Sequence, residues 1–134
     1  MNSKYALLFL SLIVVVSCAS TPSGQSFESP IGKWSEKYES MSGKKRSSVV
    51  TIVDNTHGSY TNPNGRIEFY SINDPGVWEG YWIEESGSSP CSVEKSGSLF
   101  WGVQVYEFNS AYNQYTGYWD NCGAGKRYPT KGVR

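Results

Sequence analysis

The segment VWEGYWIEES, Val77 to Ser86, decides the fold class of this chain. It is rich in aromatic and aliphatic side chains, and turn sequences flank it, NDPG before and GSSP after. This composition is typical of a β-strand. Because strand side chains alternate between two faces, Trp78, Gly80 and Trp82 share one face and Tyr81 lies on the other. A glycine between two indoles on one face indicates a sharp bend or the close approach of a neighbouring strand.

The Gly-x-Trp pattern of this strand occurs three times in the chain. The segments IGKW, ending at Trp34, and TGYW, ending at Trp119, repeat the spacing of Gly80 and Trp82. Long strands need such bends to close into a barrel. We therefore interpret the pattern as a means of curving a sheet and filling its inside with indole rings. The alternative is that some of these aromatic side chains line a ligand site.

The remainder of the chain continues the strand-and-turn pattern. Aromatic residues make up 15% of the sequence and 14 residues are glycine, which favours strands and turns over helices. We expect strands at residues 34–38, 47–55, 59–62, 66–72, 77–86, 99–108 and 114–122, and a short one near the C-terminus. The sequence thus predicts an all-β antiparallel meander of about seven or eight strands, either a small barrel or a strongly curved sheet.

The N-terminus has the pattern of a signal peptide. Lys4 precedes an apolar run, Tyr5 to Val16, that is shorter than the roughly 20 residues a membrane-spanning helix needs. The sequence VVSC, ending at Cys18, resembles the bacterial lipobox. The resemblance implies cleavage after residue 17 and attachment of acyl chains such as palmitate to Cys18. The alternative is an ordinary secretory signal with a chance cysteine.

We divide the chain into a signal peptide, residues 1–17, a lipidated cysteine with a flexible Ser-, Pro- and Gly-rich tether, residues 18–30, and one β domain, residues 31–134. Ala19 and Ser20 follow the cysteine, and no aspartate stands at the second mature position. By resemblance to the sorting rule of enteric bacteria, this implies the periplasmic face of the outer membrane. The formal net charge is zero, so the protein lacks a broad positive electrostatic field that would attract nucleic acid. We therefore expect no nucleic-acid partner.

The two remaining cysteines, Cys91 and Cys122, form a predicted disulfide. Export places them in an oxidising compartment, where such a pair is usually bridged. The alternative is a metal or redox pair. The sequence lacks a Cys-x-x-Cys motif, and His57 is its only histidine. We therefore favour the disulfide.

The segment IGKWSEKY, Ile31 to Tyr38, resembles the first strand of the calycins, the lipocalin and avidin group. In those barrels the tryptophan closes the barrel floor, and an arginine near the C-terminus packs against it. The resemblance implies that Trp34 closes the floor here, with Arg134 against it and Arg127 as the other candidate. The middle lipocalin motifs and the residues of an avidin biotin site are absent, so the resemblance concerns architecture.

Aromatic side chains are the candidate ligand-binding residues, because their rings stack on sugars and on apolar groups. They are Trp78, Trp82, Trp101, Trp119, Tyr81 and Tyr118. Glu79 lies within the aromatic run and is a candidate sugar-binding or catalytic carboxylate. The alternative is a solvent-facing or cross-strand paired charge. Glu84 and Glu85 are adjacent, so they face opposite ways on a strand and cannot form an acid–base pair. We recognise no nucleophile–base set, phosphate loop or metal cluster, and we expect neither enzyme activity nor a cofactor.

The sequence therefore predicts a membrane-anchored bacterial lipoprotein whose domain binds a small molecule or glycan without catalysis. The alternative is a protein-interaction module of the cell envelope, either an assembly accessory or a hydrolase inhibitor. That function would use the loop Gly87 to Ser98. A purely structural envelope lipoprotein is the third hypothesis.

Overall fold

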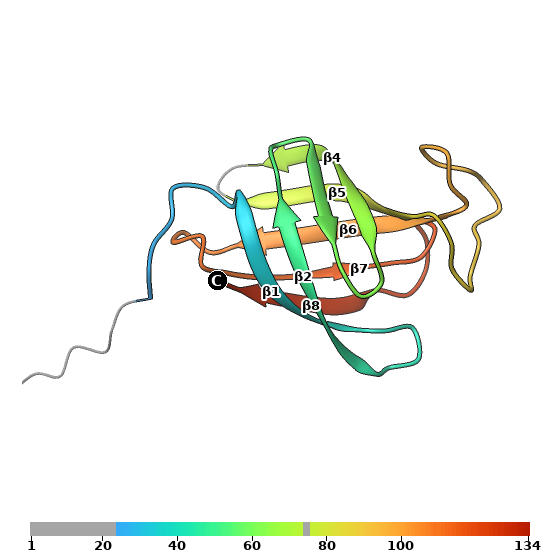
Figure 1. Cartoon of the computed structure of the whole chain (residues 1–134), viewed down its shortest axis with the longest axis horizontal. Coiled ribbons are helices and arrows are strands. Elements are labelled where there is room, and N and C mark those ends of the chain that lie inside the picture. Colours follow the sequence, from blue (N-terminus) through green and yellow to red (C-terminus); the bar gives the residue numbers. More distant parts are fainter. Residues whose placement is uncertain (1–23, 74–75) are drawn as a thin grey trace, which may run out of the picture.

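The chain folds into a closed antiparallel barrel in which each strand pairs with the next and β1 pairs with β8 (Figure 1). The computed structural model describes residues 24–73 and 76–134. The strands are β1 (Gly32–Glu39), β2 (Lys45–Ile52), β3 (His57–Tyr60), β4 (Gly65–Asn73), β5 (Val77–Glu84), β6 (Phe100–Phe108), β7 (Gln114–Trp119) and β8 (Tyr128–Val133). The predicted all-β meander is confirmed, in its closed form. The predicted signal peptide, Cys18 and two residues of the NDPG turn lie outside the described residues.

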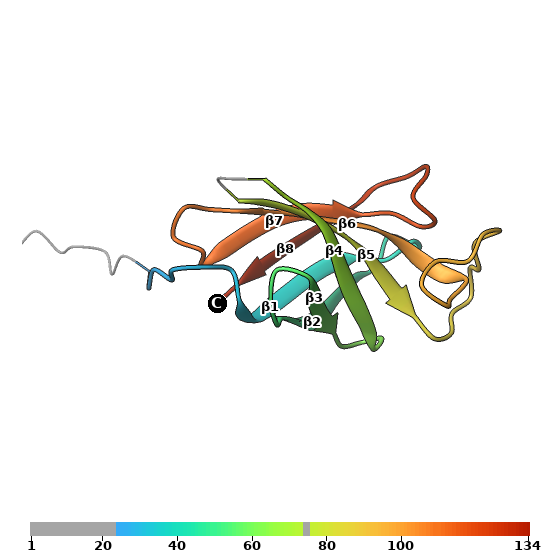
Figure 2. The ribbon, with the colours of Figure 1, turned by 90° about the horizontal axis from the view of Figure 1, so that it is seen from above.

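The two ends of the barrel differ. We call the end where β1 begins and β8 ends the closed end, and the opposite end the open end. The N-terminal segment and the C-terminus both lie at the closed end (Figures 1 and 2). The long β5–β6 loop, residues 85–99, and the β7–β8 loop, residues 120–127, project from the open end.

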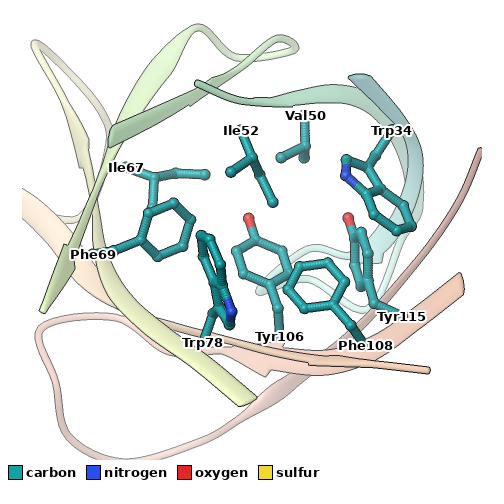
Figure 3. Packing of buried hydrophobic residues seen from close by; sticks show 9 residues of the cluster. All are labelled: Trp34, Val50, Ile52, Ile67, Phe69, Trp78, Tyr106, Phe108 and Tyr115. Atoms are coloured by element: carbon teal, nitrogen blue, oxygen red, sulfur yellow. The ribbon is translucent and has the colours of Figure 1, made fainter. Parts of the chain in front are cut away.

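A mostly aromatic core fills the closed half of the barrel (Figure 3). Its buried members are Trp34, Val50, Ile52, Ile67, Phe69, Trp78, Tyr106, Phe108 and Tyr115. The Trp34 ring centroid lies 5.2 Å from that of Phe108 and 5.1 Å from that of Tyr115. Burial of each large apolar side chain contributes about 1.5 to 3 kcal/mol, so this cluster stabilises the barrel from its closed half.

The three Gly-x-Trp strands point their tryptophans inward, and in β5 and β7 the glycines lie where neighbouring strands come close. The glycine of β1, Gly32, lies instead against the Arg134 side chain. Strand β4 shifts its register between Phe69 and Ser71, opposite Gly80. A Cβ atom on Gly80 would lie 2.7 Å from the carbonyl oxygen of Glu68. In β7, a Cβ atom on Gly117 would collide with the backbone of β6. These close approaches support the interpretation that the repeated pattern serves curvature.

Arg134 covers Trp34 at the closed end. Its guanidinium carbon lies 4.5 Å from the Trp34 ring centroid, and its Nη1 donates a 2.7 Å hydrogen bond to the carbonyl oxygen of Ile31. The Trp34 side chain is 1% exposed. This is the pairing that the calycin resemblance implies. Arg127, the other candidate, lies over the ring of Tyr118, 4.2 Å from its centroid.

The described part of the predicted tether contacts the closed end. The Phe27 amide donates a 2.8 Å hydrogen bond to the carbonyl oxygen of Ala111, and the Asn113 side chain donates to the carbonyl oxygen of Gln25 at 2.9 Å. The Arg134 guanidinium also lies 3.9 Å from the Phe27 ring centroid. Residues 25–30 therefore cover the barrel floor with their backbone and with the ring of Phe27.

The predicted disulfide is confirmed. Cys91 and Cys122 are joined across a sequence separation of 31 residues. The bond ties the β5–β6 loop to the β7–β8 loop at the open end. On the chain-entropy model, closing such a loop contributes about 3 to 4 kcal/mol to stability.

Candidate ligand-binding cavity

A cavity of about 330 Å³ occupies the open half of the barrel, above the aromatic core. Its volume is at the lower end of the range of about 300 to 1,000 Å³ that is usual for small-molecule sites. The inner lining consists of Glu36, Tyr38, Tyr60, Trp82, Glu84, Phe100, Gln104, Tyr106 and Trp119. Exposed open-end residues, among them Met41 and Ser86 to Ser88, form its rim.

Tyr106 separates the cavity from the core. Its ring packs 5.8 Å from that of Phe108 and 4.9 Å from that of Tyr115, centroid to centroid. Its hydroxyl makes no hydrogen bond with any described residue. In the described ranges, every fully buried polar side-chain atom has a hydrogen-bond partner. The unbonded Tyr106 hydroxyl is therefore not fully buried, and it reaches the cavity that Tyr106 lines. The cavity floor is thus an aromatic surface with one hydroxyl group.

Glu36 places a carboxyl group in the cavity wall, two residues beyond Trp34 on the inner face of β1. One oxygen, Oε2, accepts hydrogen bonds from Tyr115 Oη and Thr130 Oγ1, both at 2.7 Å. The other oxygen, Oε1, accepts no hydrogen bond from the described residues. It is therefore not fully buried, and it is open to the cavity. The side chain is 8% exposed. Burial raises the pKa of Glu36, and the hydrogen bonds from Thr130 and Tyr115 oppose that shift.

A second carboxyl group, that of Glu84 at the end of β5, lies nearer the rim. The Tyr60 hydroxyl donates a 2.8 Å hydrogen bond to Glu84 Oε1. Partial burial raises the pKa of Glu84, and the Tyr60 bond lowers it again in part. Its neighbour Glu85 points outward and accepts a 3.0 Å bond from Arg66, as alternation along the strand requires.

Trp82 and Trp119 form an indole wall on one side of the cavity. Their ring centroids are 5.9 Å apart with an interplanar angle of 81°. The Trp82 indole N–H donates to the carbonyl oxygen of Asp120 at 2.7 Å, and that of Trp119 donates to the carbonyl oxygen of Glu39 at 3.0 Å. Because both N–H groups are used within the protein, a ligand meets ring atoms and not indole donors.

The other predicted aromatic residues lie elsewhere. Trp78 belongs to the core, where its ring is 5.1 Å from that of Phe69. Tyr81, Trp101 and Tyr118 alternate with inward-facing residues and lie on the outer face of the barrel. There the Tyr81 and Trp101 centroids are 5.8 Å apart. Of the six predicted ligand-binding residues, the structure therefore brings only Trp82 and Trp119 into the cavity.

Several cavity residues were not singled out from the sequence. No sequence motif marks Glu36, Tyr60 or Gln104. Glu84 stands out in the sequence only as the neighbour of Glu85. Period-two alternation from Trp34 places Glu36 on the same face, so that pattern was the available signal. Glu79, which was singled out, lies on the outer face next to the bulge.

Comparisons with known protein families, curated proteins and solved structures found no match to this chain. Within residues 24–73 and 76–134, no group of three or more His, Cys, Asp or Glu side chains is arranged to hold a metal ion. The same residues include no helix that is long and apolar enough to cross a membrane.

Proposed function

We propose that this chain is a lipid-anchored protein of the bacterial cell envelope whose barrel binds a small molecule or a glycan unit without catalysis. The observation that carries the proposal is the cavity at the open end. It combines two indole faces, Trp82 and Trp119, with polar atoms that have no partner among the described residues, such as Glu36 Oε1. A largely apolar pocket with a few convergent polar groups is the usual form of a small-ligand site.

The position of the two chain ends agrees with such an anchor. The described N-terminal segment approaches the barrel at the closed end, through Phe27 and its contact with Arg134. A lipid on Cys18 would then hold the closed end toward the membrane and leave the open end facing away from it. The proposed outer-membrane location and periplasmic face follow from the sequence pattern after Cys18.

The test is ligand capture followed by titration. All eight strands and the disulfide lie after residue 31, so a chain that begins at residue 19 and is exported to a periplasm keeps the whole barrel. Native mass spectrometry of this protein should reveal a bound small molecule. The neutral dye N-phenyl-1-naphthylamine should bind with increased fluorescence and be displaced by that molecule. A barrel that carries no adduct and binds no dye would contradict the proposal.

Tryptophan variants locate the binding site. Trp82→Phe and Trp119→Phe should each change dye affinity or the tryptophan response to binding, because both rings line the cavity. Trp101→Phe is the matched control, since Trp101 lies on the outer face with its indole N–H bound to the carbonyl oxygen of Val93. An equal effect in all three variants would place binding outside the cavity.

The second candidate is a protein-interaction module, and the outer face of the barrel favours it. Tyr70, Tyr81 and Trp101 form a row of rings, and Lys95 Nζ lies 4.1 Å from the Tyr81 centroid. Val93 in the β5–β6 loop is 66% exposed. A Val93→Asp variant that loses a crosslinked envelope partner but still binds the dye would favour this function.

A further inference from the structure

The cavity contains two carboxyl groups and no cation to neutralise them. Among the described residues, neither Glu36 nor Glu84 is in an ion pair, whereas Glu39, Glu68 and Glu85 all are. The one basic residue in the lining is Arg46, which is exposed at the rim. A buried carboxylate without a cation is costly, and a cationic ligand would supply the missing partner.

The free hydrogen-bonding atoms of the inner lining of the cavity are mostly acceptors. The hydroxyls of Tyr115 and Thr130 are already donated to Glu36, and that of Tyr60 to Glu84. Both indole N–H groups are likewise used. In the inner lining, the groups without a described partner are one carboxyl oxygen each on Glu36 and Glu84, the Tyr106 hydroxyl, and the amide oxygen and one amide N–H of Gln104. Other free donors, such as Arg46 and the hydroxyls of Ser86 and Ser88, lie at the rim. A ligand that complements this set donates more hydrogen bonds than it accepts.

The walls suit the same kind of ligand. The faces of Trp82 and Trp119 carry negative charge density and attract cations within about 6 Å of a ring centroid. An ammonium group has three N–H donors and no acceptor, which matches the free oxygens. An anionic ligand would instead meet two carboxyl groups and would find a cation only at the rim.

From these observations we infer that the ligand of the cavity is a small organic amine in its ammonium form. The ammonium group lies between the Glu36 and Glu84 carboxylates, and the carbon skeleton lies against the indoles of Trp82 and Trp119. The inference rests on the proposed function and narrows it to one chemical class. The cavity volume of about 330 Å³ is sufficient for a small aromatic or alkyl amine.

Binding of the amine should depend on pH through the two carboxyl groups alone. The tyrosines that face these groups are Tyr38, Tyr60, Tyr106 and Tyr115. Burial raises the pKa of each of them above the ordinary value of 10, so they stay neutral at physiological pH. The basic residue in the lining is Arg46, which lies at the rim. Amine affinity should therefore fall as the pH is lowered and Glu36 and Glu84 take up protons.

The experiment compares ligands of the same shape and different charge by calorimetry. Phenethylamine is set against phenethyl alcohol and hydrocinnamate, and hexylamine against hexanol, on the chain that begins at residue 19. We expect each amine to bind about tenfold or more tightly than its alcohol, and hydrocinnamate to bind least. Amine and alcohol of equal affinity, or a preference for hydrocinnamate, would overturn the inference.

Variants test whether the preference for amine over alcohol depends on the two carboxyl groups. Glu36→Gln and Glu84→Gln keep the side-chain shape and should abolish the preference for amine over alcohol. Glu107→Gln, which removes the same charge from the exposed outer face of β6, should retain it. The neutral dye reports independently on the cavity. Dye binding without an amine preference would contradict the inference and leave the proposed function intact, whereas failure of both dye and amines would contradict both.

Discussion

At the scale of single residues, Trp34 is a central side chain of the barrel core. It is 1% exposed and packs against Phe108 and Tyr115, and Arg134 covers it from the closed end. Its indole N–H donates to the carbonyl oxygen of Pro30 at 2.9 Å. Truncation would leave a cavity in the core and remove the indole ring that Arg134 covers.

We expect Trp34→Ala to lower the free energy of unfolding by about 3 kcal/mol or more, because loss of a buried tryptophan usually costs that much. Urea denaturation followed by circular dichroism measures it. Trp101→Ala, on the outer face, is the control and should cost about 1 kcal/mol. Equal losses in the two variants would show that Trp34 does not close the barrel floor.

Glu36 makes stability depend on pH. Burial raises its pKa above the ordinary value of 4.5, so the folded state binds this proton more tightly than the unfolded chain does. Its stabilising contribution is therefore complete at low pH and is lost as the pH rises through the folded-state pKa. Glu84 acts in the same sense. Asp54 acts in the opposite sense. Hydrogen bonds from Thr56 and His57 lower its pKa from 3.8 to about 2, so its stabilising contribution is present above pH 3.8 and is lost as the pH falls through the lowered pKa.

We expect the free energy of unfolding of the ligand-free protein to fall as the pH rises from the ordinary carboxyl pKa of 4.5 through the raised folded-state pKa of Glu36. Glu36→Gln, which is neutral at every pH, should flatten this dependence, while Glu107→Gln should keep it. Urea denaturation at a series of pH values measures the slope. An unchanged slope in Glu36→Gln would mean that Glu36 is ionised in the folded protein without penalty.

At the scale of the strands, glycine positions allow the barrel to close. Gly102 on β6 faces inward beneath the Trp82 indole, and a Cβ atom there would lie 2.5 Å from Trp82 Nε1. It would lie closer still to the carbonyl oxygen of Asp120, which accepts the Trp82 hydrogen bond. One methyl group at this point therefore disturbs both the β6–β7 end and the cavity wall.

We expect Gly102→Ala to destabilise the barrel by at least about 2 kcal/mol through overpacking and to shift the tryptophan emission as Trp82 moves. Thermal unfolding and fluorescence measure the two effects. Gly125→Ala is the control, since nothing lies within 4 Å of its Cβ position and only the positive φ of 94° opposes the substitution. A Gly102→Ala protein as stable as the control would show that β6 has room to move.

At the scale of the whole molecule, the barrel places the N-terminal segment and the candidate cavity at opposite ends. The N-terminal segment lies at the closed end, and the β5–β6 and β7–β8 loops lie at the open end (Figure 1). Arg134 contacts Phe27 of the N-terminal segment, and the disulfide joins the two loops beside the cavity. With a lipid on Cys18, the open end would face away from the membrane. A ligand could then enter without passing between the protein and the bilayer.

We expect trypsin to cleave after Lys126 and Arg127, in the exposed β7–β8 loop at the open end, equally fast in the vesicle-anchored and the lipid-free protein. Mass spectrometry of timed digests measures the two rates. Protection of these bonds only in the anchored form would show that the open end faces the membrane, and the proposed orientation would be wrong.

The sequence by itself determined the local structure of this protein. Alternating aromatic residues, β-branched runs and turn sequences predicted the meander and most strand positions, because these signals act over a few neighbouring residues. Two cysteines in a chain with a predicted export signal predicted the disulfide. Within each strand, alternation also grouped the residues correctly, for example Trp82 with Gly80 and Trp78.

Only the tertiary structure decided which of these groups form the candidate site. Alternation does not say which face of a strand is inside, so Trp101 and Trp119 were equivalent in the sequence and lie on opposite sides of the barrel wall. Glu36 and Glu84 come from β1 and β5, and they share one cavity because closure of the barrel, through the pairing of β1 with β8, brings distant strands around a common interior. Long-range strand pairing determines that geometry, and no short segment encodes it.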